Sequence, residues 1–406
     1  MQRYDDEAGP AQASPAPKFA ATMQAIEWHG NKRVHVAERP RPVIGEVHDA
    51  VIRVTSTTIC GSDLHIYHHA VPGMHHGDVL GHECMGVVEE VGSQVQSLRP
   101  GDRVVVSSVI AEGHCQYCRE GLYGLCEVTS PVEGEHKLYG HCTAGMVGYS
   151  HLTGRYDGGQ ASHIRVPYAD TNCLVVPADL SDEQVLFLSD IACTGWHANE
   201  LGDVRCGQTV AVWGCGPVGL MAMAWARYRG AERIIAIDRI PYRLEAARQH
   251  LGAEILNFEE DEVPQALRDL THGRGPHVAI EAVGFRYPKT LLNKIEQTLG
   301  IESDPADPPG EILRSVRKGG TVAIVGDFFD HVHHLPIGVM MQKGLTVRTG
   351  QVHVQRYWRE LLEIIARGDF DPSFVISHRM PLSEAVEAYR MFDEKSDHAL
   401  KIVLRA

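Results

Sequence analysis

The stretch Thr209–Gly219, TVAVWGCGPVG, joins a short apolar run to a glycine-rich turn. The run has the composition of a buried β-strand, and the residues after the turn have the apolar pattern of a helix. Because the N-terminus of a helix attracts negative charge, a strand, a GxGxxG turn and a helix in this order predict a site for the pyrophosphate of a dinucleotide. In such a turn the first glycine permits a tight bend, the second lets the backbone approach the pyrophosphate, and the third allows close packing of the helix. The residues predicted to form this site are Gly214, Gly216, Pro217, Val218 and Gly219.

An acidic residue follows the turn at the distance expected for such a site. Asp238 ends the next apolar run, RIIAID, 19 residues after Gly219 (238 − 219). A carboxylate there would accept hydrogen bonds from the adenosine ribose hydroxyls and repel a 2′-phosphate, which favours NAD over NADP. Arg239 lies beside it and could accommodate a 2′-phosphate, so NADP is left open.

Two sequence patterns divide the chain. Around the glycine turn, helical segments alternate with apolar runs that we expect to form six buried parallel strands, a doubly wound α/β unit of the Rossmann type. From Met23 to about Leu188, short apolar runs alternate with glycine, proline and aspartate, which is typical of strands and turns. We therefore expect an α/β protein with a mostly β first part. The six runs are TVAVWG, RIIAID, EILNF, HVAIEAVG, TVAIVGDF and LTVRTG.

Length and charge limit the possible functions. The 406 residues exceed one ordinary core, so we expect two domains. A formal net charge of −14 without a Lys/Arg run argues against a nucleic-acid partner. Charged residues interrupt the apolar stretches before the roughly 20 residues that a membrane span requires, and the N-terminus lacks the apolar core of a signal peptide. The ten cysteines are therefore expected to bind metal or to pack in the core, in a cytoplasmic enzyme.

Two segments lie outside these patterns. Residues 1–22 are rich in alanine and proline without apolar periodicity, so we expect a disordered extension. The segment Lys289–Gly310, KTLLNKIEQTLGIESDPADPPG, is longer than an ordinary link between a helix and a strand. We interpret it as an insertion whose end, DPADPPG, forms a loop.

Metal-binding residue types are concentrated in the stretch Cys60–Glu83, CGSDLHIYHHAVPGMHHGDVLGHE. A catalytic zinc uses three protein ligands and keeps a fourth position open for water or substrate. Cys60 and His82 supply two such ligands, and their separation of 22 residues (82 − 60) argues against a closed structural finger. For any one of these residues alone, the alternative is a buried free cysteine or a hydrogen-bonded core histidine.

The same stretch resembles the zinc-dependent alcohol dehydrogenases of the medium-chain superfamily, in which the first ligand opens a CxSxxH-like segment and the second lies in GHE. The resemblance covers nearly the whole chain from Met23 onward. It implies a GroES-like, mostly β catalytic domain formed by residues 23–191 and 352–406, and an NAD-binding Rossmann domain formed by residues 192–351. The matching residues are Cys60, Ser62, His65, Gly81, His82 and Glu83.

The resemblance also indicates a third ligand. Most relatives have a cysteine just before the cofactor domain and a threonine near the nicotinamide four residues later; here LSDIACTGWHA has Asp190 and Thr194 at these positions, with Cys193 out of register. Zinc accepts a carboxylate oxygen, although Asp190 could instead cap the following helix. An aspartate at this position resembles the glutathione-independent formaldehyde dehydrogenases and formaldehyde dismutases. The segment GYSHLTGRYDGGQASHIRVP at 148–167 and the insertion after Lys289 are similar to the same subgroup.

Roles for other residues are implied by the same resemblance. Ser62 would accept the proton of the substrate hydroxyl and pass it, through a ribose hydroxyl of the cofactor, to His65 near the surface. Glu83 could support a ligand from behind or approach the metal transiently. Thr194 would lie near the nicotinamide. Arg243 either contacts the adenosine or is a solvated charge on a helix.

A second metal site is predicted in EGHCQYCREGLYGLC, at residues 112–126. Glu112, Cys115, Cys118 and Cys126 have the spacings of 3, 3 and 8 at which relatives with a structural zinc place four cysteines. Three thiolates and one carboxylate can close a tetrahedral zinc site. The alternative is a metal-free lobe with three free thiols.

Together these patterns predict an oxidoreductase that transfers a hydride between an alcohol, or an aldehyde hydrate, and NAD, with a catalytic Zn²⁺ and a second, structural Zn²⁺. One alternative is a formaldehyde dehydrogenase or dismutase that holds NAD tightly. Another is a nucleotide-binding protein without catalytic activity. The resemblance also suggests a homodimer or homotetramer.

Overall fold

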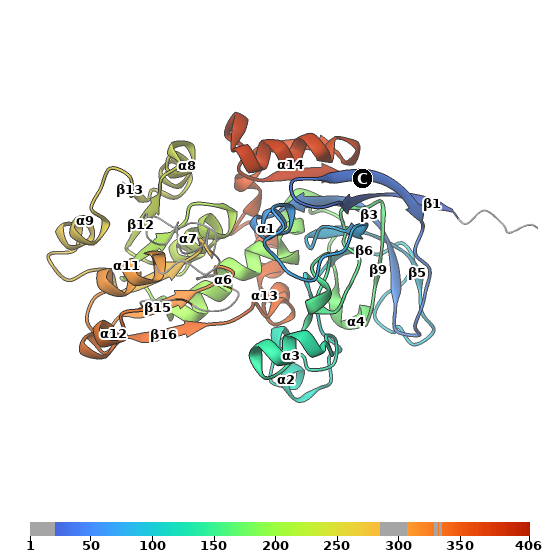
Figure 1. The fold of residues 1–406 in the computed structure, drawn as a ribbon, viewed down its shortest axis with the longest axis horizontal. Coiled ribbons are helices and arrows are strands. Elements are labelled where there is room, and N and C mark those ends of the chain that lie inside the picture. Colours follow the sequence, from blue (N-terminus) through green and yellow to red (C-terminus); the bar gives the residue numbers. More distant parts are fainter. Residues whose placement is uncertain (1–20, 285–306, 329–331, 333–334) are drawn as a thin grey trace, which may run out of the picture.

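The computed structural model, which describes residues 21–284, 307–328, 332 and 335–406, contains the predicted parallel sheet. The six apolar runs all form strands, in the order β13-β12-β11-β14-β15-β16, and all neighbours are parallel. This sheet occupies one half of the molecule in Figure 1. Its strands are β11 (Thr209–Trp213), β12 (Arg233–Asp238), β13 (Glu254–Asn257), β14 (Val278–Glu281), β15 (Thr321–Ile324) and β16 (Thr346–Thr349).

Helices cover both faces of the parallel sheet, which explains why its central strands are apolar throughout. Along β11, Val210 and Val212 pack into the same core as α7, whereas Ala211 and Trp213 pack on the opposite face with α9 and α11. The edge strand β16 is largely exposed, so the prediction of six buried strands is wrong for it, and β13 is only partly buried. An edge strand receives less cover from the helices. The helices of this half are α6 (Ile191–Gly202), α7 (Pro217–Tyr228), α8 (Pro241–Leu251), α9 (Val263–Leu270), α11 (Asp307–Ser315) and α12 (Ile337–Lys343).

The other half is built from antiparallel strands, as the alternation of short apolar runs and turns predicted. Its main sheet has the order β10-β6-β5-β3-β18-β17, with β9 paired to β3, and a three-stranded sheet has the order β2-β1-β4. The strands are β1 (Thr22–Trp28), β2 (Val34–Pro40), β3 (Ala50–Ile59), β4 (Asp78–Val79), β5 (Cys84–Val91), β6 (Arg103–Val106), β7 (Val109–Ile110), β8 (Gly145–Met146), β9 (His163–Val166), β10 (Cys173–Val175), β17 (His378–Pro381) and β18 (Ile402–Arg405). Short helices connect them: α1 (Gly61–Tyr67), α2 (Gln116–Arg119), α3 (Glu133–Tyr139), α4 (Ala169–Asn172) and α5 (Asp182–Val185).

The end of the chain returns to the β-rich half. Strand β18 pairs antiparallel with β3, with Ile402 opposite Ile59, and β17 pairs with β18. The two amphipathic helices before this strand are α13 (Val354–Ala366) and α14 (Ala385–Glu394), and α14 lies along the β-rich half in Figure 1. The chain therefore contributes to this sheet from both of its ends, while domain boundaries at residues 191 and 352 stay predictions.

Two expectations about connecting segments change. Strand β1 begins at Thr22, one residue earlier than expected, and residues 1–20 lie outside the described part. Most of the predicted insertion, up to residue 306, also lies outside it. Asp307–Gly310, predicted as a loop, instead begins helix α11. Pro308 and Pro309 are tolerated in this first turn because the first N–H groups of a helix have no partner within the helix.

The described residues contain no helix that is long and apolar enough to cross a membrane. The expected cytoplasmic location stays a prediction from the sequence.

Candidate active site

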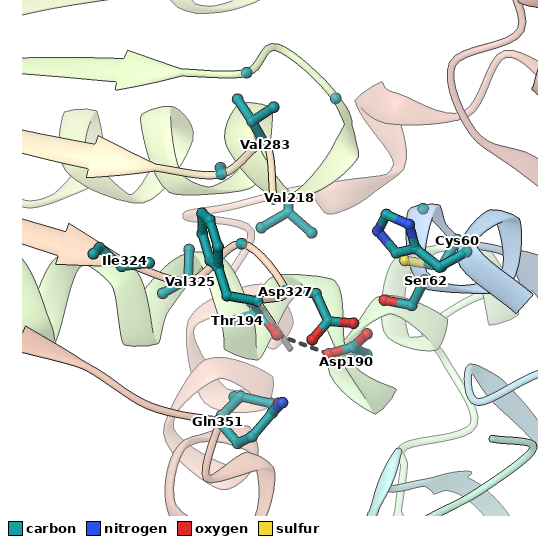
Figure 2. Close-up of a pocket in the computed structure, with 18 of the residues that line it drawn as sticks. Cys60, Ser62, Asp190, Thr194, Val218, Val283, Ile324, Val325, Asp327 and Gln351 are labelled. Carbon is teal, nitrogen blue, oxygen red and sulfur yellow. Dashed lines mark hydrogen bonds between the residues drawn. The ribbon is translucent and has the colours of Figure 1, made fainter. Parts of the chain in front are cut away.

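A cavity of about 750 Å³ lies between the two halves and extends from the glycine turn to Cys60 and His82. It opens along the carboxyl ends of the parallel strands, where open α/β sheets bind their ligands. Figure 2 shows its inner end, where Cys60 and Ser62 of the β-rich half face Val218 and Thr194 of the other half. The predicted metal and dinucleotide sites therefore share one space.

The glycine turn has the predicted conformation. Gly214 has a φ of +94°, which a side chain would strain. Gly216 caps the start of α7, with Pro217 in the first turn. A Cβ on Gly219 would lie 1.8 Å from the Gly214 carbonyl oxygen, so this glycine is required for helix packing and does not itself line the cavity.

Asp238 lies at the cavity, beside the turn, and is buried. Its Oδ2 accepts a hydrogen bond from the Cys215 N–H at 2.7 Å, and its Oδ1 accepts from the N–H groups of Arg239 and Ile240 at 2.6 and 3.0 Å. Three of the roughly four acceptor sites of this carboxylate are thus used, and Oδ2 can accept a further hydrogen bond. Arg239 and Arg243 line the same part of the cavity.

Four metal-binding side chains meet at the inner end. Cys60, His82, Glu83 and Asp190 each offer one ligand atom, and these atoms all lie within 4.8 Å of one another. They come from three separate segments: the link from β3 to α1, the residues before β5, and the residue before α6. His82 Nε2 lies 3.3 Å from Asp190 Oδ2 and 3.9 Å from Glu83 Oε1.

This donor set fits zinc. Two ligand atoms that each lie about 2.1 Å from one tetrahedral ion are about 3.4 Å apart, and the 3.3 Å between His82 Nε2 and Asp190 Oδ2 agrees with this. Among the described residues, His82 Nε2 and Glu83 Oε2 are buried and have no hydrogen-bond partner. Buried polar atoms without partners are uncommon, and a cation would satisfy these two.

Asp190 does not act as a helix cap. It stands at the N-cap position of α6, but its carboxylate makes no hydrogen bond to the backbone of the helix. Thr194 Oγ1 donates to Asp190 Oδ1 at 2.7 Å, which leaves Oδ2 directed toward His82. Burial alone would raise the pKa of Asp190, but interactions with His82 and Thr194 hold it below its usual value, so the carboxylate is charged. Cys193 points away and donates to the Leu188 carbonyl.

Asp63, which the sequence analysis missed, supports two of these ligands. Its Oδ2 accepts from the Cys60 N–H at 2.8 Å, and its Oδ1 lies 3.3 Å from His82 Nδ1. A carboxylate behind one ring nitrogen of a histidine orients the other nitrogen toward a metal. The available signal was the acidic residue three positions after Cys60.

Lys401 is the second residue that was missed. Its fully buried ammonium group donates to Glu83 Oε1 at 2.6 Å and to the Ile59 carbonyl at 3.2 Å. Glu83 therefore has a permanent cationic partner in addition to its position beside His82. A single lysine in an apolar C-terminal strand gives no signal of this pairing, because 318 residues separate the two partners.

Ser62 and His65 both line the cavity from helix α1. In Figure 2 the Ser62 hydroxyl points toward Asp190. The expectation that His65 lies near the surface is wrong, because the side chain is only 5% exposed. Helix α1 packs into the core of the β-rich half, and all of its residues from Asp63 to Tyr67 are buried.

Two further polar contacts shape the cavity wall. Tyr149 Oη donates to Asp327 Oδ2 at 2.9 Å, a bond that joins the two halves across the cavity. Glu281, at the end of β14, accepts hydrogen bonds from the N–H groups of Val283, Gly284 and Gly326 and so connects the loops after β14 and β15. Burial raises the pKa of Glu281 to about 7.

The second predicted metal site is partly assembled. Cys115, Cys118 and Cys126 form one group, with Sγ–Sγ distances of 3.4 and 4.0 Å from Cys115. Sulfur ligands at about 2.3 Å from one tetrahedral zinc would be about 3.8 Å apart. Glu112 is not part of this group, since its Oε1 accepts from the His114 N–H at 2.8 Å. Its role as the fourth ligand stays a prediction.

Known proteins resemble the chain over most of its length. The family model described as the alcohol dehydrogenase GroES-like domain matches residues 46–178, and the zinc-binding dehydrogenase model matches residues 217–298. A zinc-type alcohol dehydrogenase-like protein of Schizosaccharomyces pombe is 39% identical, covering 97% of this chain and 93% of its own length. The uncharacterized zinc-type alcohol dehydrogenase-like protein AdhB of Bacillus subtilis is also 39% identical, over 94% of this chain and 100% of its own length. Alcohol dehydrogenase TADH from Thermus sp. ATN1 has a similar structure, with a TM-score of 0.79, 38% identity, and coverage of 94% of this chain and 99% of its own.

The geometry predicts that Asp190→Ala removes the metal held with Cys60 and His82. Loss of a group that only orients a ligand costs about 10–100-fold in metal affinity or activity, so loss of a ligand should lower turnover by at least about a hundredfold. Metal analysis should show one zinc fewer per chain, while ADP-ribose, which lacks the nicotinamide, should bind with unchanged affinity. Asp203→Ala, at the other end of α6, is the matched control. Retention of all the zinc by Asp190→Ala would contradict this assignment.

Proposed function

The chain belongs to the zinc-dependent medium-chain alcohol dehydrogenases, and we propose that it interconverts a small alcohol and its aldehyde or ketone at the Cys60 site. The observation that carries this proposal is the single cavity shared by the metal-binding cluster and the glycine turn. Hydride transfer requires the carbon of a metal-bound alcohol to lie against the dinucleotide ring, and a common cavity permits this contact.

We assign the catalytic metal to Cys60, His82 and Asp190, with Glu83 beside them. A zinc ion held there would act as a Lewis acid on the substrate oxygen and ease the loss of the hydroxyl proton. Ser62 is the proton acceptor in this proposal, because its hydroxyl points into the site, and His65 on the same helix receives the proton from it through a ribose hydroxyl of the cofactor.

We propose NAD as the preferred cofactor. The Asp238 carboxylate lies at the cavity next to the glycine turn, where its charge favours ribose hydroxyls over a 2′-phosphate. Arg239, which could offset this charge, forms an ion pair with Glu259 at 3.2 Å. Thr194, Pro217 and Val218 line the inner part of the cavity, where the nicotinamide must lie to meet the substrate.

The direct test is a panel of short, branched and aromatic alcohols, each assayed with NAD and with NADP by the absorbance of the reduced cofactor. We expect metal-dependent reduction of NAD, which chelation abolishes and added zinc restores. Cofactor binding without reduction of either dinucleotide, in protein shown to contain zinc, would support a nucleotide-binding protein without catalytic activity.

The finer placement among formaldehyde dehydrogenases and dismutases is a second candidate. Asp190 favours this candidate, because an aspartate at the third-ligand position, where most relatives have a cysteine, resembles that subgroup. The same assay separates the candidates. A dismutase oxidises one hydrated formaldehyde molecule to formate and reduces a second formaldehyde molecule to methanol, with no net NADH, whereas a dehydrogenase releases NADH at each turnover.

For the second metal, we propose that Glu112 completes the site of Cys115, Cys118 and Cys126. Cys118→Ser should lose one zinc per chain and unfold at a lower temperature, because a structural zinc contributes directly to folding. Glu112→Ala should retain zinc more weakly than the wild type in a chelator titration, whereas Glu120→Ala, on the same lobe, should not. Equal zinc retention by Glu112→Ala and the wild type would reject the carboxylate as a ligand.

We propose a homo-oligomer that uses the exposed edge of the parallel sheet. Strand β16 has no neighbour on its outer side among the described residues, and an exposed edge of this kind is a template for pairing with another chain. Next to it, Ile337 and Met341 of α12 are 65% and 73% exposed. Light scattering should show a dimer or tetramer, and Met341→Lys should shift it toward the monomer. A monomeric wild type would contradict this proposal.

A further inference from the structure

The inner end of the cavity contains an acidic side chain that no step of the proposed reaction uses. Asp327 lies in the loop after β15 and lines the cavity together with Ser62 and Asp190. In Figure 2 its carboxylate points toward these two residues. Asp327 therefore faces the place where the substrate oxygen would meet the metal.

Backbone contacts fix the position of this loop. The N–H groups of Val325 and Gly326 donate to the Glu281 carbonyl at 3.0 and 3.2 Å, and the Gly326 N–H also lies 3.1 Å from the Glu281 carboxylate. The Asp327 backbone packs on Gly284, where an added Cβ would lie 2.9 Å from the Asp327 carbonyl oxygen. The loops after β14 and β15 therefore hold Asp327 in place.

A tyrosine from the β-rich half orients the carboxylate. Tyr149 Oη donates to Asp327 Oδ2 at 2.9 Å, and the tyrosine is only 9% exposed. Burial raises the pKa of Tyr149, and the negative charge of Asp327 raises it further, so the hydroxyl keeps its proton and acts as the donor. A carboxylate has about four acceptor sites, and this bond occupies one of them.

Tyr149 also lies close to the metal-binding cluster. After burial and the carboxylate partner, the charge of Cys60 is a further cause of the raised pKa of Tyr149, and the interaction of two charges falls with distance. The preceding residue, Gly148, packs on the backbone of Gly81, because a Cβ on Gly148 would lie 2.6 Å from the Gly81 nitrogen and carbonyl oxygen. Gly81 precedes the ligand His82, so the tyrosine and its carboxylate partner lie beside the predicted metal.

The neighbouring wall of the cavity in Figure 2 is largely apolar, with Val218, Val283, Ile324 and Val325. A simple alkyl alcohol bound here would remove water from the Asp327 carboxylate and give it no hydrogen bond in return, which is costly for a buried charge. A substrate with a second hydroxyl group would instead donate a hydrogen bond to the carboxylate. Hydrogen bonds to charged groups are stronger than those between neutral groups.

We propose that Asp327, oriented by Tyr149, binds a second hydroxyl group of the substrate on the carbon next to the one that is oxidised, so that vicinal diols are preferred to simple alcohols. This inference rests on the proposed function, because it needs the reacting oxygen at the Cys60 site. Oxidation of 2,3-butanediol transfers a hydride from one carbinol carbon to NAD, releases the proton of that hydroxyl and gives 3-hydroxy-2-butanone. The other hydroxyl, which stays intact, donates to Asp327.

The test measures kcat/KM for 2,3-butanediol, as mixed stereoisomers, and for 2-butanol, which has one hydroxyl group fewer, with the zinc-loaded full-length protein and NAD. A hydrogen bond to a charged group changes affinity by roughly tenfold or more, so the wild type should favour the diol by at least about tenfold. Asp327→Val should lower this preference to a ratio of about one. Asp327→Asn, which keeps an acceptor oxygen, should give an intermediate ratio.

Further variants separate substrate recognition from structural support. Tyr149→Phe keeps the ring and removes the donated hydrogen bond, so it should lower the ratio less than Asp327→Val does, through a higher KM for the diol. Asp179→Asn changes an exposed aspartate outside the cavity and is the matched control for Asp327→Asn, with the ratio of the wild type. Zinc content and ADP-ribose affinity identify variants that keep the fold. If Asp327→Val loses zinc, the result with Asp327→Asn decides.

Three results would overturn the inference. Equal kcat/KM of the wild type for 2-butanol and the diol would show that a second hydroxyl is not recognised. An unchanged ratio in Asp327→Asn and Asp327→Val would show that the carboxylate only joins the two halves through Tyr149. A preference for 3-amino-2-butanol over 2,3-butanediol would show that the site takes an ammonium group. If the zinc-loaded wild type oxidises no alcohol or diol with either dinucleotide, the proposed function fails together with this inference.

Discussion

The contact between His82 and Asp190 is the constraint on which the rest of the site depends. It joins the residues before β5 to the first residue of α6, so it connects the β-rich half to the helix that opens the other half. Helix α6 packs against α7, whose N-terminus is the glycine turn, and Trp225 of α7 donates to the Ala192 carbonyl at 2.9 Å. The packing of these two helices would therefore fix the distance between a metal held by Asp190 and the dinucleotide.

The charges of the site explain its buried supporting residues. Carboxylates and a thiol are grouped at the largely buried inner end of the cavity, and uncompensated buried charges are costly. Lys401 is fully buried and compensates Glu83, and Asp63 fixes the orientation of His82. A divalent cation would compensate Cys60 and Asp190. Ser62, His65 and Arg243, whose roles in proton transfer and cofactor binding are proposals, all line this one cavity.

The features that the sequence predicted are those encoded by neighbouring residues. Gly214, Gly216, Asp238, Cys60 and His82 lie in short motifs, and all five line the cavity, whereas Gly219 packs behind it. Lys401 was missed because its contact with Glu83 depends on how the C-terminal segment returns to the first half, which no local pattern encodes. The edge strands β13 and β16 show the same limit, since an apolar run gives no information about its place in a sheet. The start of α11 was misread because two prolines indicate a loop or the first turn of a helix equally well.

The central claim is that one ion lies between Cys60, His82 and Asp190. Anomalous diffraction at the zinc absorption edge, from crystals of the zinc-loaded protein, tests it most directly. The account predicts an anomalous peak within about 2.0–2.3 Å of Cys60 Sγ, His82 Nε2 and Asp190 Oδ2. A map without density between these atoms, or a peak bound by Cys60, His82 and Glu83 with Asp190 turned away, would contradict it.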